Sequence, residues 1–196
     1  MERSVLLVDP DAARQTRIAH SLEGTDYRIA ASAGDSEKGL RLAATIHPDV
    51  ALVGTALGNG AGIQVTERLS KEHNVPVVLL ASGSLEPPAV KLAARTGVMG
   101  FVIEPIQAAA LRATLEVAVC RFQELRALQQ ESETLRQTVE ARKVIERAKG
   151  LLMEVGRISE AEAYARIRRK SMDTQRPMAE IAQSIILSAE MSLKAR

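Results

Sequence analysis

Five short runs of apolar, mostly β-branched residues, separated by segments of helical spacing, restrict the fold of this chain more than any other feature. The runs are residues 5–8, 28–30, 50–53, 77–80 and 101–103. Between them, apolar residues recur four apart, as in Ile18 and Leu22 or Val65 and Leu69. Strand alternating with helix predicts a doubly wound α/β sheet of parallel strands, in which ligands bind at the carboxyl ends of the strands.

Positive charge is concentrated at the end of the chain. Residues 142–196 contain 12 Lys or Arg against 7 Asp or Glu, whereas residues 1–105 contain 10 against 12. The last 55 residues are therefore the only region that favours an anionic partner. The sequence has neither a basic-then-apolar leader nor an apolar run of about 18 residues. With a single cysteine, Cys120, it indicates a cytoplasmic protein without a membrane segment.

Residues 1–118 carry a set of landmarks at the ends of the apolar runs. They are Val8–Asp11 at the end of the first run, Pro48 and Asp49 before the third, Gly62 at the next helical segment, Pro76 before the fourth run and Pro105 after the fifth. This pattern, over about residues 4–118, resembles the receiver domain of two-component response regulators. The resemblance implies a flavodoxin-like fold with five parallel strands.

The resemblance also implies a phosphorylation site of five groups: two adjacent acids for a divalent metal, an acceptor aspartate, a Ser or Thr, and a Lys. Only the first acid, Asp9, is present. The other positions hold Pro10, Gly54, Ala81 and Glu104. Ser82 comes one residue late and is expected to face the other way. Because Gly54 has no carboxylate, we expect no phosphorylation at the usual acceptor.

Two carboxylates remain at the predicted strand ends. Asp9 and Glu104 could hold a hard cation. In the alternative that we prefer, both are solvated and Asp11 is the N-cap of the following helix.

Other candidate chemistry is absent from the sequence. The glycine-rich segment 58–62 matches neither the dinucleotide fingerprint nor the P-loop, and we interpret it as a strand-to-helix loop. The three histidines lack the spacing of metal ligands. We therefore expect no enzyme activity, no cofactor and no metal.

A stretch without proline or glycine begins after Pro105 and lasts to Gly150. Its apolar residues follow a heptad-like spacing with one phase slip, between Leu125 and Leu128. The positions are Leu111, Leu115, Ala118, Phe122, Leu125, Leu128, Ser132, Leu135 and Val139. A single small domain cannot bury such a stripe, so residues 106–141 are predicted to form a long helix that pairs with a second copy in a loose coiled-coil homodimer. A solvated linker helix is the alternative.

Residues 142–196 are predicted to form three amphipathic helices around one small core. The first ends near Gly156, the second starts at Ser159 in a capping box, and the third begins near Pro177. The inward positions are Val144, Ala148, Leu151, Val155, Ala163, Tyr164, Ile167, Ser171, Ile181, Ala182, Ile185 and Ala189.

The segment Ala148–Met153, which reads Ala-Lys-Gly-Leu-Leu-Met, is the most specific motif of the chain. Around it stand Ile145, Ser159-x-x-Glu162-Ala163-Tyr164, Arg168, Met172 and Ile181-Ala182. Over about residues 135–190 this pattern resembles the ANTAR domain of transcription antitermination regulators such as AmiR and NasR. Ser171 departs from it, since the family usually has alanine there. The resemblance implies binding of paired RNA hairpins in leader transcripts, and a ligand-sensing partner protein that sequesters the chain.

The residues of this region fit an RNA-binding surface. The candidates are Arg142, Lys149, Gly150, Met153, Arg168 and Arg176. On one helical face, Arg142 and Lys149 are placed for phosphates and Met153 for an exposed base. Gly150 costs about 1 kcal/mol within a helix, which indicates close approach by a neighbouring helix or by RNA backbone. Tyr164 is expected in the core.

Two other functions are compatible with the sequence. Many receivers carry a helical DNA-binding domain, but the last helix has only Glu180 and Gln183 among its early exposed residues, a poor surface for the major groove. A protein-interaction scaffold without nucleic acid is the second alternative.

Overall fold

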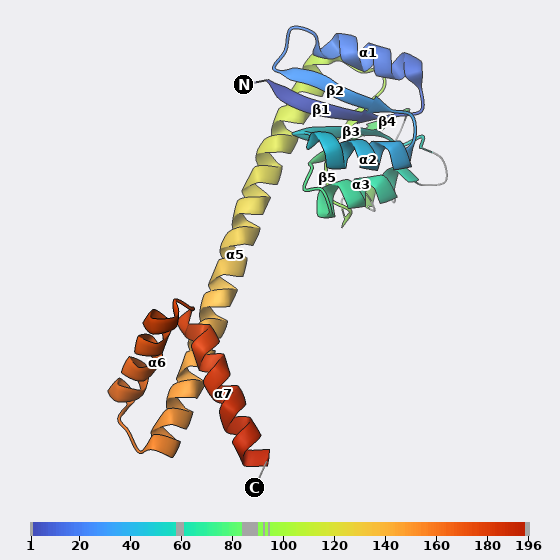
Figure 1. Cartoon of the computed structure of the whole chain (residues 1–196). Coiled ribbons are helices and arrows are strands. Elements are labelled where there is room, and N and C mark those ends of the chain that lie inside the picture. Colours follow the sequence, from blue (N-terminus) through green and yellow to red (C-terminus); the bar gives the residue numbers. More distant parts are fainter. Residues whose placement is uncertain (1, 58–60, 84–89, 92, 94, 195–196) are drawn as a thin grey trace. The chain divides into compact units, whose positions relative to one another are not determined.

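A five-stranded parallel sheet forms the centre of the first part of the chain (Figure 1). The computed structural model describes residues 2–57, 61–83, 90, 91, 93 and 95–194. The strands are β1 (Arg3–Val8), β2 (Tyr27–Ala33), β3 (Val50–Gly54), β4 (Val77–Ala81) and β5 (Val98–Ile103). Their order is β2-β1-β3-β4-β5 and every neighbouring pair is parallel. The predicted doubly wound, flavodoxin-like sheet is confirmed.

Helices cover both faces of this sheet. They are α1 (Ala12–Leu22), α2 (Ser36–Ile46), α3 (Ala61–Lys71) and the first part of α5 (Ala108–Gly156). Leu7 points to the layer of α1 and α5, where Ile18 and Leu115 are buried, whereas Leu6 points to the layer of α2 and α3, where Leu69 is buried. Because both layers exclude water, β3 and β4 are buried along their whole length and are apolar on both faces, as their continuous runs predicted.

The chain divides into two compact units, Met1–Arg126 and Ala127–Arg196, called here the N-terminal and C-terminal units. Helix α5 is one uninterrupted helix of 49 residues that begins in the first unit and ends in the second. The predicted linker helix and the first of the three predicted C-terminal helices are therefore one element. No helix in the described part of the chain has the length and apolarity needed to cross a membrane.

The apolar stripe of α5 faces different surroundings along its length. Leu111 and Leu115 have no exposed surface and lie in the core of the N-terminal unit. Leu128 and Leu135, by contrast, are 62% and 60% exposed. The prediction that the whole stripe pairs with a partner helix is therefore wrong for its first half. The phase slip after Leu125 coincides with the end of the N-terminal unit, where the stripe stops facing the sheet.

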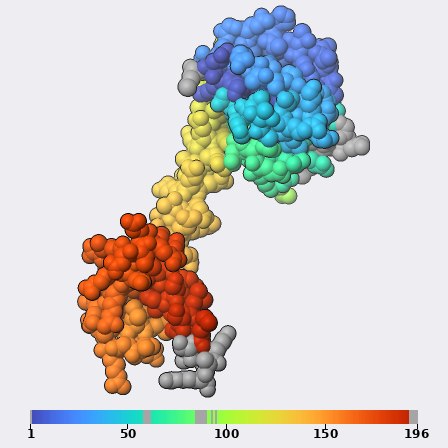
Figure 2. Space-filling model, viewed as in Figure 1, coloured from blue at the N-terminus to red at the C-terminus, as the bar shows by residue number. Residues whose placement is uncertain are grey.

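A small core holds the C-terminal unit together. Helices α6 (Glu160–Thr174) and α7 (Met178–Lys194) pack against the last part of α5 (Figure 2). Ala148, Ile167, Ala182 and Ile186 are buried between them, and of these only Ile186 was not predicted. The inward prediction is wrong for Val155, which is 81% exposed at the end of α5.

The predicted helix starts are confirmed. The Ser159 hydroxyl accepts a hydrogen bond from the Glu162 amide as the N-cap of α6. Pro177 immediately precedes α7, and its carbonyl accepts the amides of Glu180 and Ile181. Short-range capping signals thus place the ends of both helices.

Candidate functional site

The carboxyl ends of four strands meet at one edge of the sheet. Asp9 follows β1, Gly54 and Ala81 end β3 and β4, and Glu104 follows β5. Asp9 has no exposed surface, whereas 28% of the Glu104 side chain is exposed. The expectation that both carboxylates are solvated is therefore wrong for Asp9. Gly62 is the second residue of α3, the helix after β3, and the loop residues 58–60 lie outside the described residues.

The Asp9 carboxylate fills the space that a side chain at position 54 would need. A Cβ atom placed on Gly54 would lie 2.2 Å from Oδ2 of Asp9, far inside van der Waals contact. The acceptor position therefore lacks a carboxylate and also lacks room for one. The absence of a side chain at Gly54 leaves the space that the buried Asp9 carboxylate occupies.

Arg14 of α1 supplies the cation at this edge, and its side chain is only 7% exposed. Its Nη1 lies 3.4 Å from Oδ2 of Asp9, and its Nε lies 3.5 Å from Oε1 of Glu104. Its Nη2 donates a hydrogen bond of 2.9 Å to the Ser82 hydroxyl. The expectation that Ser82 faces away is wrong, because β4 ends at Ala81 and strand alternation no longer directs the next side chain.

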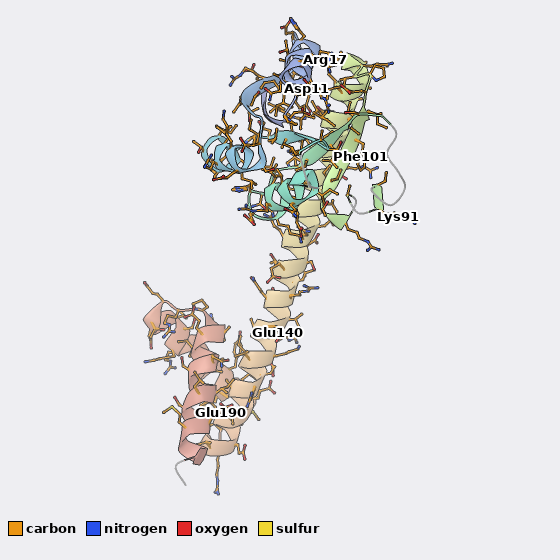
Figure 3. The ribbon with its side chains drawn as sticks, turned by 90° about the vertical axis from the view of Figure 1, so that its right-hand side faces the viewer. Asp11, Arg17, Lys91, Phe101, Glu140 and Glu190 are labelled. Carbon is orange, nitrogen blue, oxygen red and sulfur yellow. The ribbon has the colours of Figure 1, made fainter. Side chains whose placement is uncertain are left out.

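Asp11 anchors the start of α1 and thereby places Arg14. Its carboxylate accepts hydrogen bonds from the Ala13 and Arg14 amides at 2.9 and 3.1 Å, which confirms the predicted N-cap. These hydrogen bonds, above all that of Arg14, lower the pKa of Asp11. Figure 3 labels Asp11 with Arg17, whose Nη2 lies 3.0 Å from Oε1 of Glu104. Two arginines of one helix therefore neutralise Glu104.

Burial and the neighbouring groups have opposite effects on the pKa of Asp9, which is raised overall. Burial raises the pKa of Asp9, while the hydrogen bond from the Asp11 amide and the charge of Arg14 act in the opposite direction. Neither the Oδ2 atom of Asp9 nor Nε and Nη1 of Arg14 has a hydrogen-bond partner among the described residues. Charge attraction, not hydrogen bonding, therefore holds this pair together.

The groups at this edge do not fit a divalent metal. Pro10 stands where the resemblance requires the second acid, and a guanidinium lies between the carboxylates of Asp9 and Glu104. Across the described residues, no three His, Cys, Asp or Glu side chains are arranged to hold a metal ion. The cation that Asp9 and Glu104 share is an arginine of the same chain.

In the C-terminal unit, Lys149 joins α5 to α6. Its side chain is 8% exposed, and its ammonium donates hydrogen bonds to Glu146 at 2.9 Å and to Glu160 of α6 at 2.6 Å. These hydrogen bonds, that of Glu160 foremost, raise the pKa of Lys149. The sequence placed Lys149 on an open face for phosphate. The structure corrects this, because its charge is buried and already paired.

Tyr164 is exposed, so its predicted core position is wrong. Ala163 and Ile167 form the buried line of α6, and Tyr164 lies off that line with 44% of its surface exposed. It shares four-residue spacing with Arg168 and Met172, both exposed, so these three form one line on the helix. That spacing was the sequence signal that could have placed Tyr164 outward.

Six exposed residues of α5 and α6 are candidates for a binding surface, which we call the α5–α6 face. They are Arg142, Gly150, Met153, Tyr164, Arg168 and Met172. The ion pair between Lys149 and Glu160, the residue one turn before Tyr164, joins its two sides. Within the part of the chain that the structure describes, neither Arg142 nor Arg168 forms an ion pair.

Gly150 opens directly to solvent on this face. No atom lies within 4 Å of the position that its Cβ would occupy. A neighbouring helix of the same chain therefore does not explain this glycine.

The turn between α6 and α7 accommodates the unusual serine. The Ser171 hydroxyl donates a hydrogen bond of 2.5 Å to the Arg176 carbonyl, which an alanine could not make. The Arg176 side chain is exposed and pairs with Glu180 at 3.0 Å. Arg176 is thus accessible, but its charge is already shared.

Models of known protein families match both units of the chain. A model of the response regulator receiver domain matches residues 5–116, and a model of the ANTAR domain matches residues 133–186. The chain is 30% identical over 184 residues to the transcriptional regulatory protein PdtaR of Mycobacterium tuberculosis, covering 94% of this chain and 89% of PdtaR. It is 27% identical over 118 residues to the transcriptional regulatory protein AfsQ1 of Streptomyces coelicolor, covering 60% of this chain and 52% of AfsQ1.

Solved structures agree for the N-terminal unit. The signal receiver domain of a modulated diguanylate cyclase from Desulfovibrio desulfuricans aligns with a TM-score of 0.54 and 28% identity, covering 63% of this chain and 98% of that domain. The response regulator domain of Thermotoga maritima CheB aligns with a TM-score of 0.55 at 22% identity, covering 61% of this chain and 97% of that one. The second similarity supports the fold alone.

Proposed function

The chain belongs to the response regulators that join a receiver domain to an ANTAR domain, and we propose that it is a transcription antitermination regulator that binds leader-transcript hairpins as a homodimer. Its relative PdtaR is a transcriptional regulatory protein. The proposal accordingly assigns binding to this chain and no catalysis.

The α5–α6 face is the observation that carries the RNA proposal. RNA loops are recognised by bases that stack on aromatic rings or guanidinium planes. Tyr164 offers an exposed ring, Arg168 offers an unpaired guanidinium one turn further on, and Gly150 lets a backbone approach α5. Arg142 would contact phosphate, and Met153 an unstacked base. We assign Lys149 to the support of this face, because its ammonium is already paired.

The exposed half of the α5 stripe supports the homodimer. Leu128, Leu135 and Val139 are all more than half exposed and follow heptad spacing. Glu131 and Arg136 flank them and lie five residues apart, the separation at which opposite charges meet across a parallel two-stranded coiled coil. Neither makes an ion pair within the described residues. A second copy of the chain in the same direction satisfies both the apolar stripe and these charges.

We further propose that the N-terminal unit is not phosphorylated and is controlled by a ligand-sensing partner protein. Gly54 cannot accept a phosphoryl group. Asp49 offers no substitute, since it lies at the opposite end of β3 and its carboxylate accepts the Ser4 amide at 2.7 Å. Small phosphodonors should leave no acid-labile phosphate on residues 1–118; an adduct mapped to Asp9, Asp11 or Asp49 would contradict this.

Duplex DNA is the competing ligand, and α7 argues against it. Of its early exposed residues, Glu180 pairs with Arg176 and Gln183 is uncharged. Further along, Leu187 and Met191 are apolar and exposed. Major-groove recognition uses a helix with several donors aimed at base edges, which α7 lacks.

The test is a titration of the full chain with RNA carrying two neighbouring hairpins, with one hairpin, and with DNA duplex of the same sequence, each compared at the same salt concentration and repeated over a series of salt concentrations. Two hairpins should bind most tightly, because a dimer links two weak contacts. Binding should weaken with salt as arginines displace counterions from phosphate. Equal affinity for DNA would favour the DNA-binding alternative, and no binding to either nucleic acid would favour the scaffold.

Two variants test the face itself. Tyr164→Ala should lower RNA affinity by roughly 5- to 150-fold, the equivalent of about 1–3 kcal/mol for one stacked base. Arg168→Ala should lower affinity and flatten the salt dependence. Arg166→Ala is the matched control, because it lies on the same helix and its guanidinium already pairs with Glu162. If all three bind RNA alike, the α5–α6 face is not the RNA site.

A further inference from the structure

Arg14 lies among groups that follow three different strands. Asp9 follows β1, Ser82 follows β4 and Glu104 follows β5, and the guanidinium is within 3.5 Å of an oxygen atom of each. Asp11, at the start of the same helix, lies 3.9 Å from Nε. Side chains distant in the sequence are thus collected around one buried positive charge.

The site around Arg14, called here the pocket, has its acid and its cation in different places from the pattern that the receiver resemblance implies. That pattern has two acids after the first strand and a lysine after the fifth. Here the fifth strand is followed by an acid, Glu104, and the cation comes from helix α1. The pocket is therefore complete without a divalent metal or a phosphoryl group: three carboxylates face Arg14, and Arg17 adds a second cation at the rim.

We propose that Arg14 is a built-in cation, which takes the place of the divalent metal in this pocket, closes it to metal and phosphate ions, and ties the ends of β1, β4 and β5 to helix α1. Asp9 in turn occupies the acceptor's place, 2.2 Å from where a Cβ of residue 54 would be. A displacement of the end of β1 or β5 would separate the buried Arg14 from a carboxylate, which is strongly unfavourable, and a displacement of the end of β4 would break its hydrogen bond with Ser82. The strand ends, which carry the phosphorylation site in the receiver pattern, are thereby held in one arrangement in this chain. This inference does not depend on RNA binding.

The first test measures whether metal ions enter the pocket of the full chain. Mn²⁺ is added and the broadening of amide NMR signals around Asp9, Gly54 and Ser82 is followed. In the unaltered protein these signals should stay sharp at millimolar Mn²⁺, and Mg²⁺ should leave the Tm unchanged. Selective broadening at these residues would overturn the proposal, because it would show that the guanidinium leaves room for a metal.

The second test compares Arg14→Met with Arg17→Met, a matched control that also removes a cation facing Glu104 but lies in solvent. Arg14→Met should lower the Tm by at least about 5 °C, and Arg17→Met by less than about 2 °C. Adding Asp9→Asn to Arg14→Met should recover part of the loss, because no buried charge then lacks a partner. Equal Tm values for the two single variants would overturn the proposal.

A pH series separates a counter-ion from a mere packing role. Without Arg14, the charged groups that act on the buried Asp9 carboxylate are Asp11 and Glu104, both negative, and the Asp11 amide is its remaining hydrogen-bond donor. The pKa of Asp9 therefore rises further. The native state then takes up a proton that the unfolded state does not, and Arg14→Met should regain Tm relative to the unaltered protein as the pH falls from neutral toward the pKa of an unfolded aspartate, about 3.9. A constant Tm difference across this range would contradict the proposal. If Arg14→Met does not fold, Arg14→Lys keeps the charge without the reach to Ser82 and should fall between the two.

Discussion

The N-terminal unit pairs the buried charges at its strand ends and covers both faces of its sheet, whereas the C-terminal unit leaves most of the molecule's large exposed hydrophobic side chains in solvent. In the first, Asp9 and Arg14 neutralise each other out of contact with solvent, and both faces of the sheet are covered. In the second, Tyr164 and Arg168 lie open on α6. Nine of the twelve large, exposed hydrophobic side chains among the described residues belong to the C-terminal unit.

This difference favours the binding of partners to the C-terminal unit. A site whose groups neutralise one another has little to gain from a ligand, because binding would first have to break those contacts. Exposed aromatic, apolar and basic groups on a small unit gain free energy when a partner covers them. The contrast therefore favours the C-terminal unit as the part that binds RNA and a second copy of the chain, as we propose.

The largest expected effect is the difference in stability between substitutions in the buried half and in the exposed half of the α5 stripe. Leu115→Ala should destabilise the N-terminal unit by about 2–5 kcal/mol, because it removes a fully buried side chain from the core. Leu135→Ala should leave that unit intact and weaken the dimer, because its side chain is 60% exposed. Thermal unfolding and light scattering separate the two outcomes. A dimer unaffected by Leu135→Ala and by Leu128→Ala would show that self-association lies elsewhere.

The next effect tests how tightly the pocket of the N-terminal unit is filled. Gly54→Ala should cost about 1–3 kcal/mol, since its methyl group would have to displace the buried Asp9 carboxylate. Gly34→Ala is the control in the same unit, because nothing lies within 4 Å of its Cβ position. Denaturant unfolding gives both values. A Gly54→Ala protein as stable as the control would mean that Asp9 can leave the acceptor position freely.

In the C-terminal unit, substitution of Gly150 should raise the stability of the free protein, whereas substitution of Gly54 should lower it. Gly150→Ala should stabilise the free protein by up to about 1 kcal/mol, because alanine favours helix and meets no atom of this chain. The same change should weaken RNA binding if backbone approaches there. Thermal melts and RNA titrations of one preparation measure both. Gained stability with unchanged RNA affinity would remove Gly150 from the proposed site.

The smallest effect concerns the ion pair that joins α5 to α6. The Lys149 ammonium lowers the pKa of Glu160, whose usual value is 4.5. Such a group contributes stability above its unfolded pKa and loses it as the pH falls through the lower, folded value. The unaltered C-terminal unit should therefore lose stability below about pH 4.5 more steeply than Lys149→Met, in thermal melts at a series of pH values. Parallel pH profiles would contradict this role for Lys149.

Much of the molecule could be predicted from short stretches of sequence. Strands and helices follow from apolar periodicity, helix starts from Asp11, Ser159 and Pro177, and the missing phosphoacceptor from Gly54 alone. The phase slip after Leu125 also marked the end of the N-terminal unit, although its meaning came only with the structure. These features depend on residues that are neighbours along the chain, so their physical causes are local.

Only the tertiary structure decided which charges are paired and which faces are open. Arg14 and Glu104 are ninety residues apart in the sequence, yet they lie 3.5 Å apart, because α1 and the end of β5 meet at one sheet edge. The ammonium of Lys149 forms an ion pair with Glu160, which lies on the next helix. Tyr164 is exposed because Ala163 and Ile167 are the residues of α6 that face the small core. Pairing and burial depend on what packs nearby in space, which a periodic pattern within one helix does not contain.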